Sequence, residues 1–133
     1  MIVLKYIICY SILWKGLKYM SKKNSFFRLE MLFLKVLDRK DCYGYEISKL
    51  LSEGTNNLIN IKEGVLYPIL YKLLENKHIS SYEKQVGRKI RVYYHIEPSG
   101  EEKMFEMIKE YRKLTVGIDN LISIQVGDNV WNV

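Results

Sequence analysis

The chain has 133 residues, of which 48% are hydrophobic and 27% are charged. This length fits a single domain, and the apolar fraction can build a core without disulfides or a metal ion. The two cysteines, Cys9 and Cys42, have neither the number nor the spacing of a zinc or redox motif, which indicates free thiols in a reducing compartment. We therefore expect a cytoplasmic protein with no cofactor.

The net charge of +6 is unevenly distributed, with a pI near 9.2. Residues 62–91 carry seven basic and three acidic side chains, whereas residues 92–133 carry four basic and seven acidic ones. A concentrated positive field attracts a polyanion and speeds its encounter with the protein. A charge excess by itself also fits a solvated basic surface, so the motifs of this stretch must decide between the two interpretations.

The sequence lacks the patterns typical of an enzyme or a metal site. It has no glycine-rich phosphate loop and no nucleophile with a plausible base. His78 and His95 are not combined with cysteines or carboxylates at ligand spacing. The sequence therefore predicts neither catalysis nor metal binding.

Residues 1–24 form a predicted N-terminal extension. Its apolar run, Tyr6 to Trp14, is too short to span a bilayer and has no small-residue cleavage site after it, so we expect no stable membrane insertion. Two interpretations stay open. Translation beginning at Met20 would make residues 1–19 an artefact of the reading frame, whereas the flanking lysines also fit an amphipathic surface helix.

Two helices are predicted next. The first, residues 25–37, is apolar on nearly every side, which suggests that a partner chain covers part of it. The second, residues 43–52, follows Asp41, which we expect to be its N-cap. Gly44, at its start, fits a site where backbones pack closely.

A third helix is predicted from Gly64 to Glu75, with an apolar side and an outer side. Its exact start stays open: Asn60 with Glu63 fits a capping box, whereas Lys62 would be a poor cap if the helix began there. Pro68 lies beyond the first turn, where it removes a helical hydrogen bond, so we expect a bend or an irregular first turn near Gly64. The outer side carries Lys62, Tyr67, Tyr71 and Lys72.

A β-hairpin follows, with one strand at residues 79–85 and the other at residues 90–96, both of alternating pattern. The tip between the strands is compact and basic. Three helices followed by a two-stranded ribbon with a cationic tip is the order of elements in a winged helix-turn-helix. The sequence thus predicts a mainly α fold with a small β-hairpin wing, covering residues 25–97.

One long helix is predicted over residues 98–125, opened by a capping box at Ser99 and Glu102, and a tail over residues 126–133. Its apolar residues recur with a period close to 3.5, which a helix needs to pack along another helix. We expect it to be the dimerisation helix of a homodimer. The predicted dimer contacts are Met104, Met107, Leu114, Ile118, Leu121 and Ile122.

Three motifs resemble those of the PadR-like transcriptional regulators. Residues 43–47 read YGYEI, like the family's GYE element, and residues 64–68 read GVLYP, like its GTLYP recognition helix. Gly87-Arg88 and Tyr93-Tyr94 are similar to its wing. The resemblance covers about Phe27 to Leu121, and the single helix after the wing looks like the short-armed branch. Val65 replaces the family's usual threonine.

This resemblance implies a dimeric, cytoplasmic, usually repressing regulator that binds a two-fold symmetric DNA operator. Two recognition helices can enter successive major grooves when they are about 34 to 36 Å apart. Core packing stays open as the alternative role for Tyr67 and Tyr71. The predicted DNA contacts are Lys62, Tyr67, Tyr71 and Lys72 on the helix and Arg88, Lys89 and Arg91 on the wing.

Some short-armed relatives hold a flat hydrophobic ligand between their final helices, and the resemblance places Tyr111 at that position. The predicted pocket consists of Phe105, Ile108, Tyr111 and Thr115, which could equally fill the dimer seam. A second function stays open as well: a winged-helix module that binds protein or RNA without an operator. Steep salt dependence and a preference for an inverted repeat would distinguish DNA binding from it.

Overall fold

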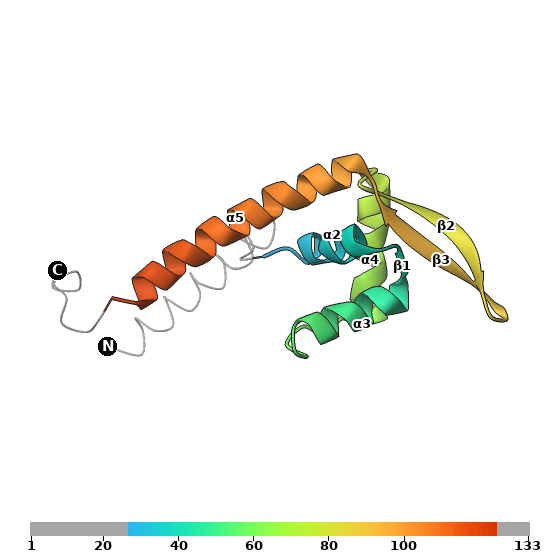
Figure 1. Cartoon of the computed structure of the whole chain (residues 1–133), viewed down its shortest axis with the longest axis horizontal. Coiled ribbons are helices and arrows are strands. Elements are labelled where there is room, and N and C mark those ends of the chain that lie inside the picture. Colours follow the sequence, from blue (N-terminus) through green and yellow to red (C-terminus); the bar gives the residue numbers. More distant parts are fainter. Residues whose placement is uncertain (1–26, 125–133) are drawn as a thin grey trace, which may run out of the picture.

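The computed structural model describes residues 27–124, so the predictions for residues 1–24 and 126–133 lie outside the described part. The helices are α2 (Leu29–Arg39), α3 (Gly44–Gly54), α4 (Glu63–Glu75) and α5 (Pro98–Ile122). Strands β1 (Cys42–Tyr43), β2 (Ile79–Val86) and β3 (Lys89–Ile96) form an antiparallel sheet in the order β1-β3-β2. In Figure 1, β2 and β3 project from one end as a wing, and α5 extends beyond the other labelled helices at the opposite end. The predicted winged helix-turn-helix fold is confirmed.

Helix α2 is the centre of the hydrophobic core. It packs against α3, α4, α5 and β3, and both Phe33 and Leu34 are completely buried. The protomer's own elements therefore cover the buried apolar residues of α2, and a partner chain on its remaining apolar residues stays a prediction. The core also contains Leu37, Ile47, Leu51, Leu66, Leu70, Leu73, Ile79, Tyr94, Ile96, Met104 and Met107.

Strand β1 was not predicted, because a strand of two residues carries no periodic signal. Cys42 pairs with Tyr94, and Tyr43 pairs with Tyr93. Helix α3 then begins at Gly44 with Tyr43 as its N-cap, so the prediction that Asp41 is the N-cap was wrong. Asp41 contacts the wing instead.

Helix α4 is continuous from Glu63, so the expected bend or irregular first turn near Gly64 stays a prediction. The Lys62 carbonyl accepts two backbone N–H groups, at 2.9 and 3.0 Å, as the Glu97 carbonyl does at the start of α5. Lys62 is the N-cap and no side chain caps the helix, so the predicted capping box of Asn60 and Glu63 was wrong. Pro68 lies inside the helix and leaves the Gly64 carbonyl without its usual partner. Gly64 is exposed, so water can solvate that carbonyl.

Helix α5 begins at Pro98 with Glu97 as its N-cap. The predicted capping box of Ser99 and Glu102 was therefore wrong. The Ser99 hydroxyl donates to the Lys77 carbonyl at 2.8 Å, which joins the start of α5 to the turn between α4 and β2. Within residues 27–124, no helix is both long enough and apolar enough to cross a membrane.

Candidate nucleic-acid interface

The leucines on one side of helix α4 are buried in the core, and the opposite side of the helix is exposed to solvent. Lys62, Lys72 and Tyr71 are on the exposed side, and Tyr71 is 60% exposed. Tyr67 is half-buried, with its ring centroid 6.2 Å from that of Tyr71. The outer face expected from the sequence is therefore present, and Tyr67 lies at its edge.

Lys72 is paired with a carboxylate of the same chain. Its Nζ lies 2.6 Å from Oε1 of Glu30 on α2, whose side chain is only 16% exposed. The charge that the sequence assigned to this outer face is thus partly neutralised. Nothing local in the sequence indicates this contact, because the two residues lie on helices far apart in the chain.

A groove of about 590 Å³ lies between the start of α3, helix α4 and the wing. Its wing side is apolar, with Ile90 69% and Val92 43% exposed. The groove therefore combines phenolic hydroxyls, one guanidinium group, the carboxylate of Glu63 and open apolar surface. Its lining includes Tyr43, Tyr45, Tyr67, Tyr71, Ile90, Arg91 and Val92.

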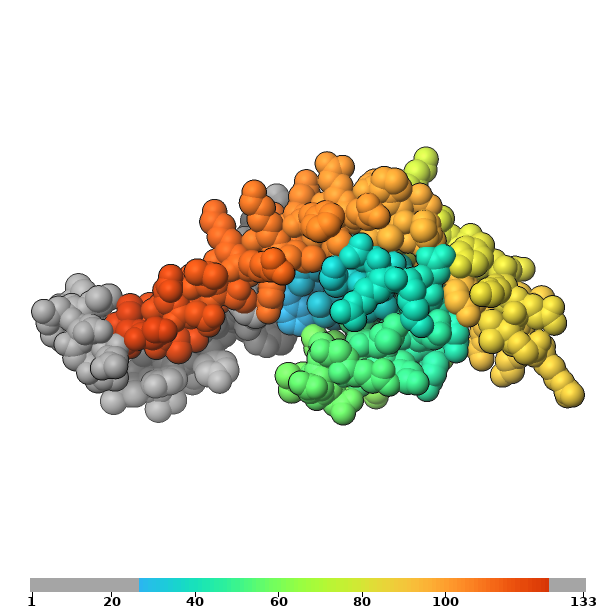
Figure 2. Space-filling view, viewed as in Figure 1, coloured from blue at the N-terminus to red at the C-terminus, as the bar shows by residue number. Residues whose placement is uncertain are grey.

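The wing tip is a two-residue turn at Gly87 and Arg88. Gly87 has a φ of +63°, which glycine adopts readily and which hairpin turns of this length require. Arg88 and Lys89 are exposed. Figure 2 shows the wing, in yellow, projecting past the helices, so its tip can reach a partner that the helices also contact.

One face of the sheet carries a row of three tyrosines, one from each strand. Tyr93 on β3 lies between Tyr43 and Tyr82, with ring centroids 5.5 and 5.7 Å away. Arg91 lies over the Tyr43 ring at 5.0 Å, and Lys84 lies over the Tyr93 ring at 5.4 Å. These cation–π contacts restrict two basic side chains of the wing. Lys84 was not predicted as a site residue, although its pairing with Arg91 follows from the hairpin register.

Asp41 ties the loop after α2 to both long strands of the wing. Its carboxylate accepts a hydrogen bond from the Tyr82 hydroxyl at 2.7 Å and contacts Nδ1 of His95 at 2.7 Å. Partial burial raises the pKa of Asp41, but the hydrogen bonds from His95 and Tyr82 outweigh it, and the resulting pKa lies below 3.8. The bond to Asp41 raises the pKa of His95 above 6.5, against the opposite effect of partial burial.

Replacing Asp41 by asparagine should return the pKa of His95 toward 6.5. In the wild type, the contribution of protonated His95 to folding stability is complete below pH 6.5. It is lost as pH rises through the raised pKa of His95. The stabilisation from Asp41 is present above 3.8 and is lost as pH falls through the lowered pKa. The ion pair between Asp41 and His95 is therefore strongest between pH 3.8 and pH 6.5. NMR titration of the His95 ring measures the shift, and an unchanged titration in Asp41→Asn would contradict the tether.

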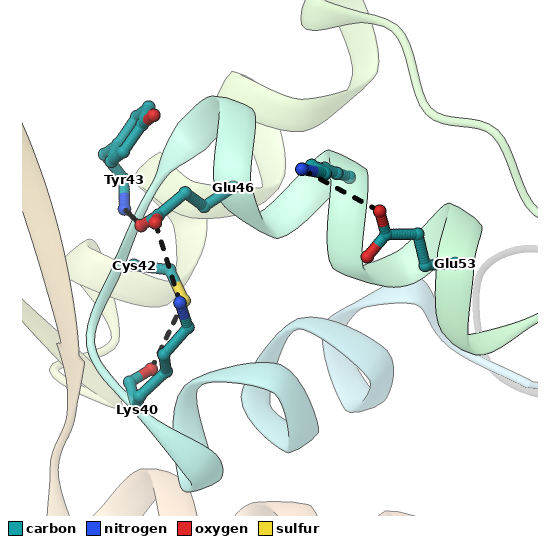
Figure 3. A network of polar contacts seen from close by, with 6 residues as sticks. Lys40, Cys42, Tyr43, Glu46 and Glu53 are labelled. Atoms are coloured by element: carbon teal, nitrogen blue, oxygen red, sulfur yellow. Dashed lines mark hydrogen bonds and ion pairs between the residues drawn. The ribbon is translucent and has the colours of Figure 1, made fainter.

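Polar contacts hold the start of α3 beside the groove (Figure 3). Glu46 accepts the backbone N–H of Tyr43 at 3.3 Å and lies 3.6 Å from the Lys40 ammonium. The buried Cys42 thiol donates to the Lys40 carbonyl at 3.4 Å. Burial raises the pKa of this thiol, which keeps it protonated and structural.

The residues predicted on α5 divide into two groups. Met104 and Met107 are buried in the protomer's own core, whereas Leu114, Leu121 and Ile122 are exposed. Ile118 is half-buried. Within the predicted pocket, Ile108 and Tyr111 pack against the core and Phe105 is 63% exposed. The Thr115 hydroxyl donates to the helix backbone at Tyr111 and Arg112.

Within residues 27–124, no three histidine, cysteine or carboxylate side chains are grouped so that they could hold a metal ion. The surface that stands out in this part of the chain is the groove with its neighbouring cations. We refer to α4, the groove and the wing tip together as the α4–wing surface.

Comparison with known proteins identifies the fold and the family. The sequence profile of the transcriptional regulator PadR-like family matches residues 33–106. A transcriptional regulator from Clostridium thermocellum is 35% identical, covering 71% of this chain and 92% of that one, with a TM-score of 0.64. A PadR family transcription regulator from Clostridium difficile is 28% identical, covering 71% and 97%, with a TM-score of 0.63. Bacillus subtilis PadR, solved in complex with operator DNA, is 23% identical, covering 60% and 45%, with a TM-score of 0.55.

The profile match spans more than half of the chain, from α2 into the first part of α5. It contains α3, the α4–wing surface and the groove. The family consists of transcriptional regulators. This chain belongs to the PadR-like family of transcriptional regulators.

Proposed function

We propose that this protein is a cytoplasmic, homodimeric repressor that binds an inverted-repeat operator in double-stranded DNA through the α4–wing surface. The observation that carries the proposal is that the exposed side of α4 and a wing with a cationic tip border one groove. In this arrangement α4 enters the major groove. Arg88 and Lys89 at the tip reach the backbone or the adjacent minor groove.

The groove chemistry suits one strand of the DNA backbone. The hydroxyls of Tyr67 and Tyr71 and the guanidinium of Arg91 can donate to phosphate oxygens, which are frequent partners of such groups in DNA complexes. The exposed Ile90 and Val92 offer apolar surface to the deoxyribose rings. Lys62, at the N-terminus of α4, adds a cation for phosphate.

Helix α5 supplies the dimer contact in this proposal. Leu114, Leu121 and Ile122 are 43%, 52% and 73% exposed on a helix of 25 residues. Exposed apolar side chains on a long helix favour packing against a second copy. Met104 and Met107 contribute indirectly, because they anchor α5 to the protomer's core. The dimer brings two copies of α4 to successive major grooves, about 34 to 36 Å apart.

A small planar hydrophobic effector relieves repression by binding between the two α5 helices. Phe105, Ile108, Tyr111 and Thr115 are its proposed lining, with aromatic faces for stacking. A panel of planar cationic and phenolic compounds tests this part through tyrosine fluorescence and thermal stability of the purified dimer. Absence of any response would contradict the effector, but not DNA binding.

The test of the function is selection of bound fragments from the source genome with the purified dimer. The selected fragments should share an inverted repeat, and affinity for it should fall steeply as salt rises. Equal affinity for unrelated duplexes, or a preference for RNA, would contradict operator binding. The second outcome would favour an RNA-binding module.

Replacing Glu30 by glutamine should strengthen DNA binding by about threefold to fivefold, because it releases Lys72 from its ion pair. Lys72→Ala should weaken binding only modestly, since its charge is already shared. Affinity for the selected operator, measured by fluorescence anisotropy at several salt concentrations, checks both. The double variant should match Lys72→Ala; an increase that persists in it would show that Glu30 does not act through Lys72.

A further inference from the structure

Gly44 occupies a position where the backbone does not require glycine. It is the first residue of α3. Its φ is not positive, since Gly87 is the described glycine that has a positive φ. Alanine favours a helix over glycine by up to about 1 kcal/mol. The conformation of the backbone therefore does not explain why residue 44 is glycine.

That cause is the space above Gly44. A Cβ atom placed there would lie 3.0 Å from Oη of Tyr67, 3.3 Å from its Cζ and 3.2 Å from Cδ2 of Leu66. Real Cβ atoms rarely have neighbours this close, so a neighbouring side chain must shift by a few tenths of an ångström. Leu66 is 2% exposed and is held by the core, whereas Tyr67 is half-buried at the groove. The phenol of Tyr67 is therefore the group that would be displaced.

The position of this phenol determines what the groove presents. Tyr67 and Tyr71 lie side by side in the lining, with the start of α3 on one side and Arg91 on the wing. Because Gly44 has no side chain, the end of the Tyr67 ring can rest directly against the start of α3. The contact links the two helices of the helix-turn-helix at the edge of the α4–wing surface.

We propose that Gly44 is a positioning residue: its missing side chain holds the Tyr67 hydroxyl at the place from which it donates to a DNA phosphate. This rests on the proposed function of the α4–wing surface. Gly44 itself does not touch the DNA. It acts through Tyr67, and its effect on affinity disappears when the Tyr67 hydroxyl is removed.

The experiment compares Gly44→Ala, Tyr67→Phe and the double variant with the wild type. Each single variant should bind the selected operator about tenfold more weakly, the effect of one lost hydrogen bond to a charged group. The double variant should bind no more weakly than either single variant, because both remove the same interaction. Gly54→Ala is the matched control: it lies on the same helix, no atom lies within 4 Å of its added Cβ, and its affinity should equal that of the wild type.

Two further measurements separate positioning from a loss of fold. The NMR signals of the Tyr67 ring should shift in Gly44→Ala and stay unchanged in Gly54→Ala. If Gly44→Ala lowers thermal stability, the double variant should restore it, since Tyr67→Phe removes the atom nearest the new methyl group. Wild-type affinity in Gly44→Ala, or losses that simply multiply in the double variant, would overturn the inference. A wild type that fails to bind any inverted repeat would overturn the proposed function first, and the inference with it.

Discussion

Replacing Arg88 and Lys89 together by alanine should weaken operator binding by roughly 50- to 100-fold at 0.1 M salt. Each phosphate contact contributes about 0.9 to the slope of log affinity against log salt concentration, so the variant's slope should be smaller by about 2. Both side chains are exposed at the wing tip and make no contact that holds the fold, so stability should stay within about 0.5 kcal/mol of the wild type. Anisotropy titrations at four or more salt concentrations measure the slope.

The matched control removes two lysines elsewhere. Lys109 and Lys113 are exposed on α5, so their alanine variant has the same net charge as the wing variant. Its affinity should fall much less, because long-range attraction is screened within about 10 Å at this salt concentration. Equal losses in both variants would show that total charge, and not the wing tip, governs binding.

Replacing Gly100 by alanine should lower the free energy of unfolding by about 3 kcal/mol, the range of a severe steric clash. A Cβ atom at this position would lie 2.1 Å from the carbonyl oxygen of His78. That carbonyl cannot move away easily, because it accepts the backbone N–H of Glu97 at 2.9 Å. The start of α5 would have to separate from the turn between α4 and β2. Urea denaturation at fixed protein concentration measures the loss.

Gly117→Ala is the control for this substitution. Gly117 lies inside the same helix, is exposed, and has no atom within 4 Å of an added Cβ. Alanine there should leave stability unchanged or raise it by up to about 1 kcal/mol. If Gly100→Ala is as stable as Gly117→Ala, the close packing of α5 on the turn is incorrect.

Local patterns predicted the wing well. Alternation placed its strands at residues 79–85 and 90–96, and the structure extends each by one residue at the tip. The positive φ of Gly87 was not predicted, although a two-residue hairpin loop requires a backbone angle that glycine adopts most readily. The exposure of Tyr71 on the outer side of α4 likewise follows from periodicity. Alternation failed for the outer part of the wing, where Ile90 and Val92 are exposed although they lie on the apolar face of β3.

Helix starts were predicted less well. Asp41, Asn60 and Ser99 each have the side chain of a good N-cap, yet each contacts another segment: the wing, Ser52 of α3 and Lys77, respectively. A capping signal describes only what a side chain can do within one turn. Competing partners that fold close to it, such as Tyr82 for Asp41, are absent from that local pattern.

For this protein, the sequence by itself determined the order of the elements, the alternation of the wing, the basic stretch of residues 62–91 and the family motifs. These depend on residues close together in the chain, whose spacing sets which side of a helix or strand is apolar. Tertiary structure alone decided that α2 packs against the protomer's own elements, that Glu30 pairs with Lys72, and that Tyr67 rests on Gly44. These contacts join segments distant in sequence, and only the packed core brings them within reach of one another.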